Sequence, residues 1–181
     1  MSELRPRIVI AHAREDVVVV WAEVLAGVPS VEIRRASARD LLSDPRLQAV
    51  VLPAVMAHEK VGASPRASES QILSTQGQSL AATAPWIVTV PMREGRITGW
   101  RTVGKHQQPV IEPLVSVTPA ELVVCQMHGV LRAVIDFNAL KDAQERINTL
   151  GLDLGLLGIG RKDDGRVQAE ALRDLLLSLP A

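Results

Sequence analysis

Residues 48–65 read QAVVLPAVMAHEKVGASP, and this stretch indicates the fold class of the whole chain. It begins as a short apolar strand over residues 48–52, meets Pro53, and is then predicted to continue as a long loop. The polar and glycine positions of that loop are His58, Glu59, Lys60 and Gly62. Ligands of α/β proteins bind beyond the carboxyl ends of such strands, so the loop is a candidate wall of a binding site.

Strand and helix patterns alternate on both sides of this stretch. Strands are predicted at residues 7–11, 31–34, 86–90, 110–115 (an edge strand interrupted by Pro113) and 154–159. Helices are predicted at residues 16–25, 38–42, 68–75, 118–137, 141–149 and 167–179, with an irregular hairpin at 93–105. A strand at residues 17–20 is the alternative for the first helix. The pattern predicts one α/β domain over residues 1–181, with a central mixed sheet flanked by helices.

The helix that begins near residue 118 has the clearest signals. Thr118 is the expected N-cap, Pro119 fills the first helical position, and Glu121 completes a capping box. The expected buried row on this helix is Val123, Met127, Val130, Val134 and Phe137. The polar row opposite contains Glu121, His128, Arg132 and Asp136.

The composition restricts the class of function. Lys plus Arg number 20 and Asp plus Glu number 20, so the formal net charge is zero, and aromatic residues make up 2% of the chain. Proteins that bind nucleic acids are usually basic, and those that bind single strands stack bases on aromatic side chains, so the composition argues against nucleic acid as a partner. A single cysteine excludes an internal disulfide bond and indicates a reducing compartment. No signal peptide or membrane-spanning stretch is evident, so we expect a cytoplasmic protein.

A second loop with glycines follows the predicted strand at residues 154–159. Gly158, Gly160 and Gly165 allow backbone amides to converge on an anion before the last helix. Arg161 and nearby basic residues add positive charge. The residues at positions 163 and 164 are aspartates, which can cap that helix themselves and repel a phosphate.

The order of these parts resembles that of a macrodomain. Residues 21–62 resemble the front half of the family: a helix, a V-E-I strand, a polar turn, and a strand with an Ala-Val-Val run followed by Pro-Ala and a small-residue loop. APWIVTVPM, residues 84–92, resembles the middle strand that ends below the ligand site. Residues 154–177 resemble the last strand, the phosphate-binding glycine loop and the closing helix.

The resemblance implies a three-layer fold with a cleft for ADP-ribose or another nucleotide-like molecule, free or attached to a macromolecule, and no cofactor or metal. The implied ligand-binding residues are Pro53, Ala54, Val55, Met56, His58, Gly62, Gly158, Ile159, Gly160 and Arg161. Ile159 would contact the ribose-phosphate, and the loop amides would hold the diphosphate. Glu59 is the candidate catalytic residue if ADP-ribosyl linkages are hydrolysed.

Three positions depart from the family pattern. The turn at residues 35–39 lacks the Gly-Asp pair that binds adenine, Val55 stands where the family has Asn, and Gly62 stands alone where the family has three glycines. Each lost hydrogen-bond partner of a polar ligand costs about 1–3 kcal/mol. The alternative function is therefore a degenerate, non-enzymatic macrodomain that acts as a protein-interaction module.

Other candidate sites have weaker support. Cys125 and His128 have a spacing that two metal ligands can share, but no Cys or His cluster supplies the remaining ligands. Basic residues surround Trp100 in the 93–105 segment, which predicts a flap over a phosphorylated ligand, a nucleic-acid contact or a solvated hairpin. Ser70, Ser74 and Thr75 have no neighbouring His–Asp arrangement in the sequence.

Overall fold

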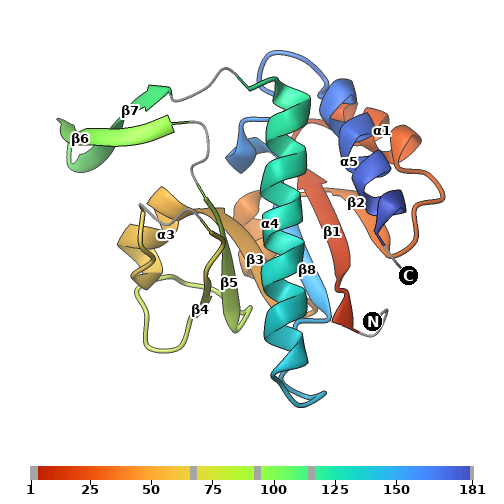
Figure 1. Cartoon of the computed structure of the whole chain (residues 1–181), viewed down its shortest axis with the longest axis horizontal. Helices are drawn as coiled ribbons and strands as arrows, with labels where there is room; N and C mark the ends of the chain where they lie inside the picture. Colours follow the sequence, from red (N-terminus) through yellow and green to blue (C-terminus); the bar gives the residue numbers. More distant parts are fainter. Residues whose placement is uncertain (1–3, 66–68, 92–94, 114–116, 180–181) are drawn as a thin grey trace.

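A mixed six-stranded sheet forms the centre of the molecule in a computed structural model that describes residues 4–65, 69–91, 95–113 and 117–179 (Figure 1). Its strands, in spatial order, are β2 (Val31–Arg35), β1 (Arg7–His12), β8 (Thr149–Asp153), β3 (Ala49–Pro53), β5 (Trp86–Val90) and β4 (Ile72–Ser74). The paired strands are parallel except for β4, which runs antiparallel to β5. A separate antiparallel hairpin consists of β6 (Gly95–Val103) and β7 (His106–Pro113).

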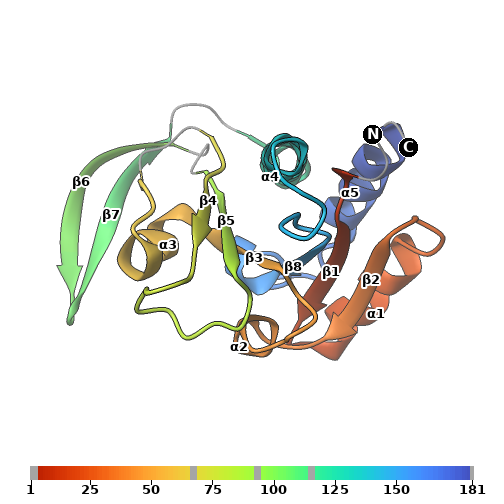
Figure 2. The same cartoon turned by 90° about the horizontal axis from the view of Figure 1, so that it is seen from below.

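Helices cover both faces of the sheet. They are α1 (Glu15–Val24), α2 (Ala38–Leu42), α3 (Ala54–Val61), α4 (Pro119–Ala139) and α5 (Arg166–Ser178). Side chains of α1, α4 and α5 share one hydrophobic core with one face of the sheet, and α2 and α3 share a second core with the other face. Figure 2 shows α4 and α2 on opposite sides of the strands. The predicted three-layer α/β fold with a mixed sheet is therefore confirmed.

The strand order places the carboxyl ends of β1, β8 and β3 side by side at one edge of the sheet. The chain leaves β1 for β2 on one side and later passes through β3 to β5 on the other side, while β8 lies between β1 and β3. The direction of winding therefore reverses around β8, and a sheet of this type binds ligands at that edge. The segments after β3 and after β8 both begin at this edge, as the sequence predicted for the two glycine-containing loops.

Several predicted elements are confirmed. The apolar stripe of α1 is buried through Val17, Trp21 and Val24, so the alternative strand at residues 17–20 is wrong. At the start of α4, the Thr118 hydroxyl accepts a hydrogen bond from the Glu121 amide, and the Glu121 carboxylate accepts one from the Thr118 amide, which is the predicted capping box. Strand β5 matches the predicted 86–90 strand.

The predicted long loop after β3 is wrong, because residues 54–61 form helix α3. Pro53 is its N-cap, and Gly62 ends it with a left-handed backbone conformation. Its small apolar residues Ala54, Ala57 and Val61 recur at helical spacing and are buried against the sheet. The small side chains of this segment give only a weak amphipathic signal, so the sequence does not predict the helix.

Three further predictions fail near the sheet. Residues 72–74 pair with β5 as strand β4, so the helix predicted at 68–75 is wrong, and residues 66–68 lie outside the described part of the chain. Residues 141–148 form turns in place of the predicted helix, because the Asn138 side chain binds both the amide and the carbonyl of Ile147. The last strand lies at residues 149–153, and residues 155–157 form a 3₁₀ turn in place of the predicted strand.

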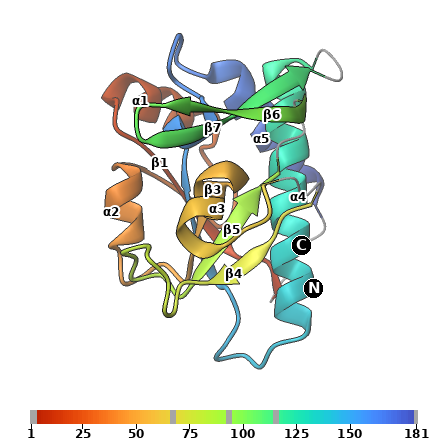
Figure 3. The same cartoon turned by 90° about the vertical axis from the view of Figure 1, so that its left-hand side faces the viewer.

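A hairpin is present, but it is longer than predicted: the 93–105 segment supplies only β6 and the turn, and the residues predicted as a separate edge strand belong to its second strand, β7, with a register shift between Ile97 and Gly99. Residues 93–94 of the predicted hairpin and residues 114–115 of the predicted edge strand lie outside the described residues. Figure 3 shows the hairpin across the end of the molecule above α3. Among the described residues, no helix has both the length and the hydrophobicity needed to cross a bilayer.

Candidate functional site

The candidate site lies at the carboxyl edge of the sheet, where β8 ends in a glycine-containing loop. The register between β3 and β8 ends at Val50 opposite Gly151, whereas β8 stays paired with β1 as far as Asp153 opposite Ala11. The chain that leaves β8 therefore remains close to β1. It then runs alongside the first turns of α4 before it enters α5.

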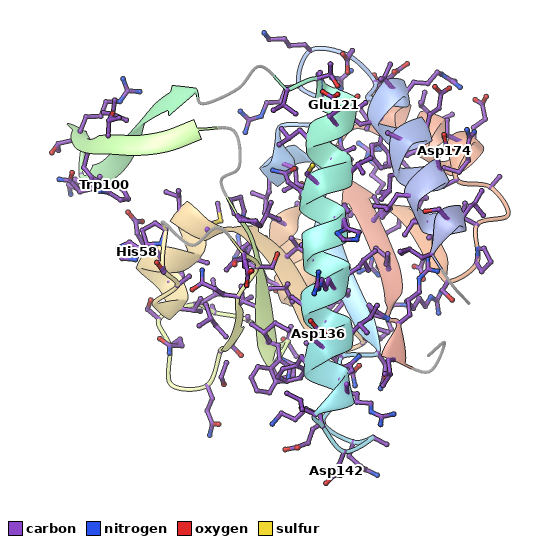
Figure 4. The ribbon with its side chains drawn as sticks, viewed as in Figure 1. His58, Trp100, Glu121, Asp136, Asp142 and Asp174 are labelled. Atoms are coloured by element: carbon purple, nitrogen blue, oxygen red, sulfur yellow. The ribbon has the colours of Figure 1, made fainter. Side chains whose placement is uncertain are left out.

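A groove of about 370 Å³ lies between the start of α4 and residues 157–163, which we call the glycine loop. This volume is within the range of small-molecule sites, near its lower end. The lining residues are Val117, Pro119, Leu122, Val123, Gln126, Leu157, Gly158, Ile159, Arg161, Lys162, Asp163 and Gln168. In Figure 4, Glu121 marks the turn of α4 that forms one wall of this groove. The groove thus combines apolar walls with two amide side chains and two cations.

Gln126 is the most informative residue of the groove. It is only 7% exposed, it lines the groove, and its side chain makes no hydrogen bond to any residue that the structure describes. The nitrogen and oxygen of this side chain are not among the fully buried polar atoms that lack a partner, so both reach the groove surface, where water or a polar ligand can bond to them. A bound polar ligand would supply partners to Gln126. The sequence prediction missed this residue, although its position three residues after Val123 places it on the buried side of α4.

The backbone amides of the glycine loop divide into two groups. Gly158 N donates to Gly155 O at 3.1 Å, and Ile159 N donates to Leu154 O at 3.0 Å, so these two amides are satisfied within the chain. The amides of Gly160 and Lys162 make no hydrogen bond within the described residues. Gly160 is buried and does not line the groove, so a phosphate group in the groove would meet the unpaired amide of Lys162.

The first turn of α5 is not available to a phosphate. Asp163 Oδ1 accepts a hydrogen bond from Gly165 N at 2.9 Å, and Asp164 Oδ1 accepts one from Arg166 N at 3.0 Å. The two carboxylates thus occupy amides that an anion at this helix end would use, as expected from the sequence. Positive charge nearby comes from Arg161 and Lys162, which are exposed at the groove.

Two buried polar residues below the loop were missed by the sequence analysis. His12 ends β1 and is 6% exposed, while Asp153 ends β8 and is 7% exposed. His12 Nδ1 accepts a hydrogen bond from Arg14 N at 3.0 Å, and Asp153 Oδ1 accepts one from Leu156 N at 3.2 Å. The available signal was a polar residue at the end of an otherwise apolar strand, in RIVIAH and in TLGLD.

The predicted binding residues do not all meet. Gly158, Ile159 and Arg161 line the groove, and Gly160 is part of the same loop. The residues predicted from the first segment do not line it: Pro53 and Val55 are half-buried, Ala54 is buried, and Met56, His58, Glu59 and Gly62 are exposed. His58 Nδ1 lies 2.8 Å from Ala63 O, and its ring faces Trp100 of the hairpin at a centroid distance of 6.2 Å.

A second groove, of about 570 Å³, lies between α4 and the segment that leads into β4. Its lining includes Ser70, His128, Arg132 and Asp136, but Arg132 and Asp136 are strongly exposed and pair with each other at 3.8 Å. The segment at residues 69–72 lies beside the end of β5, since Gln71 N donates to Thr89 Oγ1 and Ile72 pairs with Val88, and so this groove is away from the end of β8. The described residues contain no group of three or more His, Cys, Asp and Glu side chains that could hold a metal ion.

Comparisons with protein-family models, with curated proteins and with solved structures gave no match.

Proposed function

We propose that this protein binds a nucleotide-like molecule that carries phosphate, in the groove between α4 and the glycine loop. The observation that carries the proposal is Gln126, an amide that is 7% exposed, lines the groove, and has no partner among the described residues. ADP-ribose is the first ligand to test. The same group attached to a macromolecule would enter the groove from the exposed Lys162 side.

The groove offers a different type of contact to each part of such a ligand. Leu122, Leu157 and Ile159 provide apolar surface for a base or a ribose ring. Gln126 carries a donor and an acceptor side by side for a polar ring edge or a hydroxyl group. Arg161 and Lys162, together with the unpaired amide of Lys162, favour a phosphate.

The resemblance to macrodomains supports this proposal through the order of its parts. Strand β8, the glycine loop and α5 follow one another as the resemblance implied, and the loop begins at the reversal point of the sheet. Hydrolysis of an ADP-ribosyl linkage is not part of the proposal. Glu59, the candidate catalytic residue, is exposed on α3 and does not line the groove.

Isothermal titration with ADP-ribose, ADP, AMP and adenosine tests the proposal. We expect Lys162→Glu to lower the affinity for ADP-ribose and ADP at least tenfold and to leave the affinity for adenosine unchanged, because only the phosphate contact is altered. Gln126→Leu should lower the affinity for all four ligands. Lys60→Glu is the matched control, since Lys60 is exposed on α3 outside the groove. The proposal fails if the unmodified protein binds none of the four.

A second candidate is a protein-interaction module that has no small-molecule ligand. The observation that favours it is exposed apolar surface on the hairpin and α3: Trp100 is 38% exposed, Val110 42% and Met56 41%. Trp100 lies toward His58 of α3 at one end of the molecule (Figure 4). The two candidates differ in the titration: the interaction module predicts no heat from any of the four ligands.

A further inference from the structure

We infer that Arg14 and His12 are positioning residues, which hold the glycine loop at Gly160 and thereby place Lys162, with its unpaired amide, at the groove. The ligand side of this inference rests on the proposed function. The contacts that define it lie below the loop and do not involve the groove-lining residues of α4.

Arg14 connects the loop to the end of β1. Its Nη1 donates to Gly160 O at 2.8 Å, and its backbone amide donates to His12 Nδ1 at 3.0 Å. The other side of its guanidinium pairs with Asp16, with Nε donating to Asp16 Oδ1 at 3.1 Å. The head group is thus already bound on two sides. Arg14 therefore acts on a ligand through the loop and not by direct contact.

His12 supports the same point of the loop from below. Because Nδ1 accepts the Arg14 amide, the proton of the neutral ring is on Nε2. A Cβ atom at Gly160 would lie 2.8 Å from His12 Nε2 and 3.0 Å from Val17 Cγ2, so the loop backbone packs directly on the ring. Only a residue without a side chain allows this approach.

Asp153 holds the other end of the loop segment. Its Oδ1 accepts the Leu156 amide at 3.2 Å, and it pairs with Ala11 across the β1–β8 ladder. A Cβ atom added at Gly155 would lie 3.0 Å from Asp153 Oδ1 and 3.7 Å from His12 Nε2, so the side chains of Asp153 and His12 are neighbours. The segment is therefore fixed at residue 156 by β8 and at residue 160 by β1. Fixing a loop in its bound conformation improves affinity because less ordering remains to be done on binding.

Arg14→Gln tests the inference, because the Arg14 side chain is 46% exposed and its removal should leave the core intact. We expect the affinity for ADP to fall about tenfold and the affinity for adenosine to stay unchanged, because only the phosphate contact depends on the loop. Amide hydrogen exchange at residues 160–162 should become faster. Arg173→Gln on α5, which removes an arginine paired with Asp174, is the matched control and should change neither property.

A pair of variants at His12 tests the second residue. His12→Asn retains an acceptor near the position of Nδ1, so its affinity for ADP should stay within about threefold of that of the unmodified protein. His12→Leu has no acceptor there, and its affinity for ADP should fall about tenfold. Equal losses for ADP and adenosine in Arg14→Gln would indicate general damage and overturn the inference. If the unmodified protein does not bind ADP, the proposed function fails, and unchanged exchange at residues 160–162 in Arg14→Gln then separately overturns the positioning role.

Discussion

Replacing Gly160 by alanine should destabilise the protein much more than the same change at Gly158. Both residues have left-handed backbone conformations, with φ of 75° at Gly160 and 77° at Gly158. An alanine in this conformation is strained by about 1 kcal/mol at either position. At Gly158 the new methyl group would meet no atom within 4 Å, so strain is the whole cost there.

At Gly160 the methyl group would also overlap His12 and Val17, at 2.8 Å and 3.0 Å. The His12 ring cannot easily move away, because its Nδ1 is bound to the Arg14 amide and the residue is 6% exposed. Overpacking of this kind adds about 1–3 kcal/mol. The expected total is about 2–4 kcal/mol for Gly160→Ala, against about 1 kcal/mol for Gly158→Ala.

Urea denaturation followed by tryptophan fluorescence measures the difference, since Trp21 is fully buried. We expect the midpoint of Gly160→Ala to lie clearly below that of Gly158→Ala with an unchanged m-value. A difference of about 2 kcal/mol corresponds to roughly 4–8 °C in Tm for a chain of this size. Equal midpoints for the two variants would refute the close packing of the loop on His12.

Three further predictions concern stability. Asp44 is hydrogen-bonded by Arg46 at 2.9 Å and by Arg34, which lowers the pKa of its carboxyl well below the usual range, so the stability it provides is complete at neutral pH and is lost as pH falls below about 4. Asp44→Asn should therefore cost about 1–3 kcal/mol in urea denaturation at pH 7, and this difference from the unmodified protein should shrink steadily as pH falls below about 4. Asn138→Ala should cost about 2–4 kcal/mol, because it leaves the buried amide and carbonyl of Ile147 without their partner, and a cost below about 1 kcal/mol would contradict this role. Thr118→Ala should cost about 1 kcal/mol by thermal unfolding through loss of the α4 cap, whereas an unchanged Tm would show that the cap contributes nothing.

The layers of the fold could be predicted from local signals. The capping box at Thr118 and the apolar stripe of α1 are local signals, each carried by neighbouring residues of the helix that it predicts. The apolar run at 86–90 predicts β5 in the same way. These elements agree with the tertiary structure because local preference and burial favour the same conformation.

The elements that the sequence did not predict depend on distant partners. Strand β8 contains Gly151, where an added Cβ would lie 2.6 Å from Leu47, so glycine is needed for packing at a position that weakens the strand signal. Strand β4 is only three residues long and exists through its pairing with β5. The turn at 141–148 is held by Asn138, whose contacts with Ile147 span nine residues.

The candidate site was predicted in part for the same reason. The glycine loop was found from its composition, and it does lie at the reversal point of the sheet. Gln126 was missed because the groove forms only when α4 packs beside the loop, and that packing has no local sequence signal. The first predicted wall, residues 53–62, became a helix whose small residues pack into the core.

Backbone NMR during a titration with ADP-ribose is the most direct test of where a ligand binds. We predict saturable shifts of the amide signals of Gly160 and Lys162 and of the side-chain amide of Gln126, with no comparable shifts in α3. Saturable binding that shifts residues 54–62 and leaves the glycine loop unchanged would contradict the proposed groove, and so would the absence of any shift at millimolar ADP-ribose.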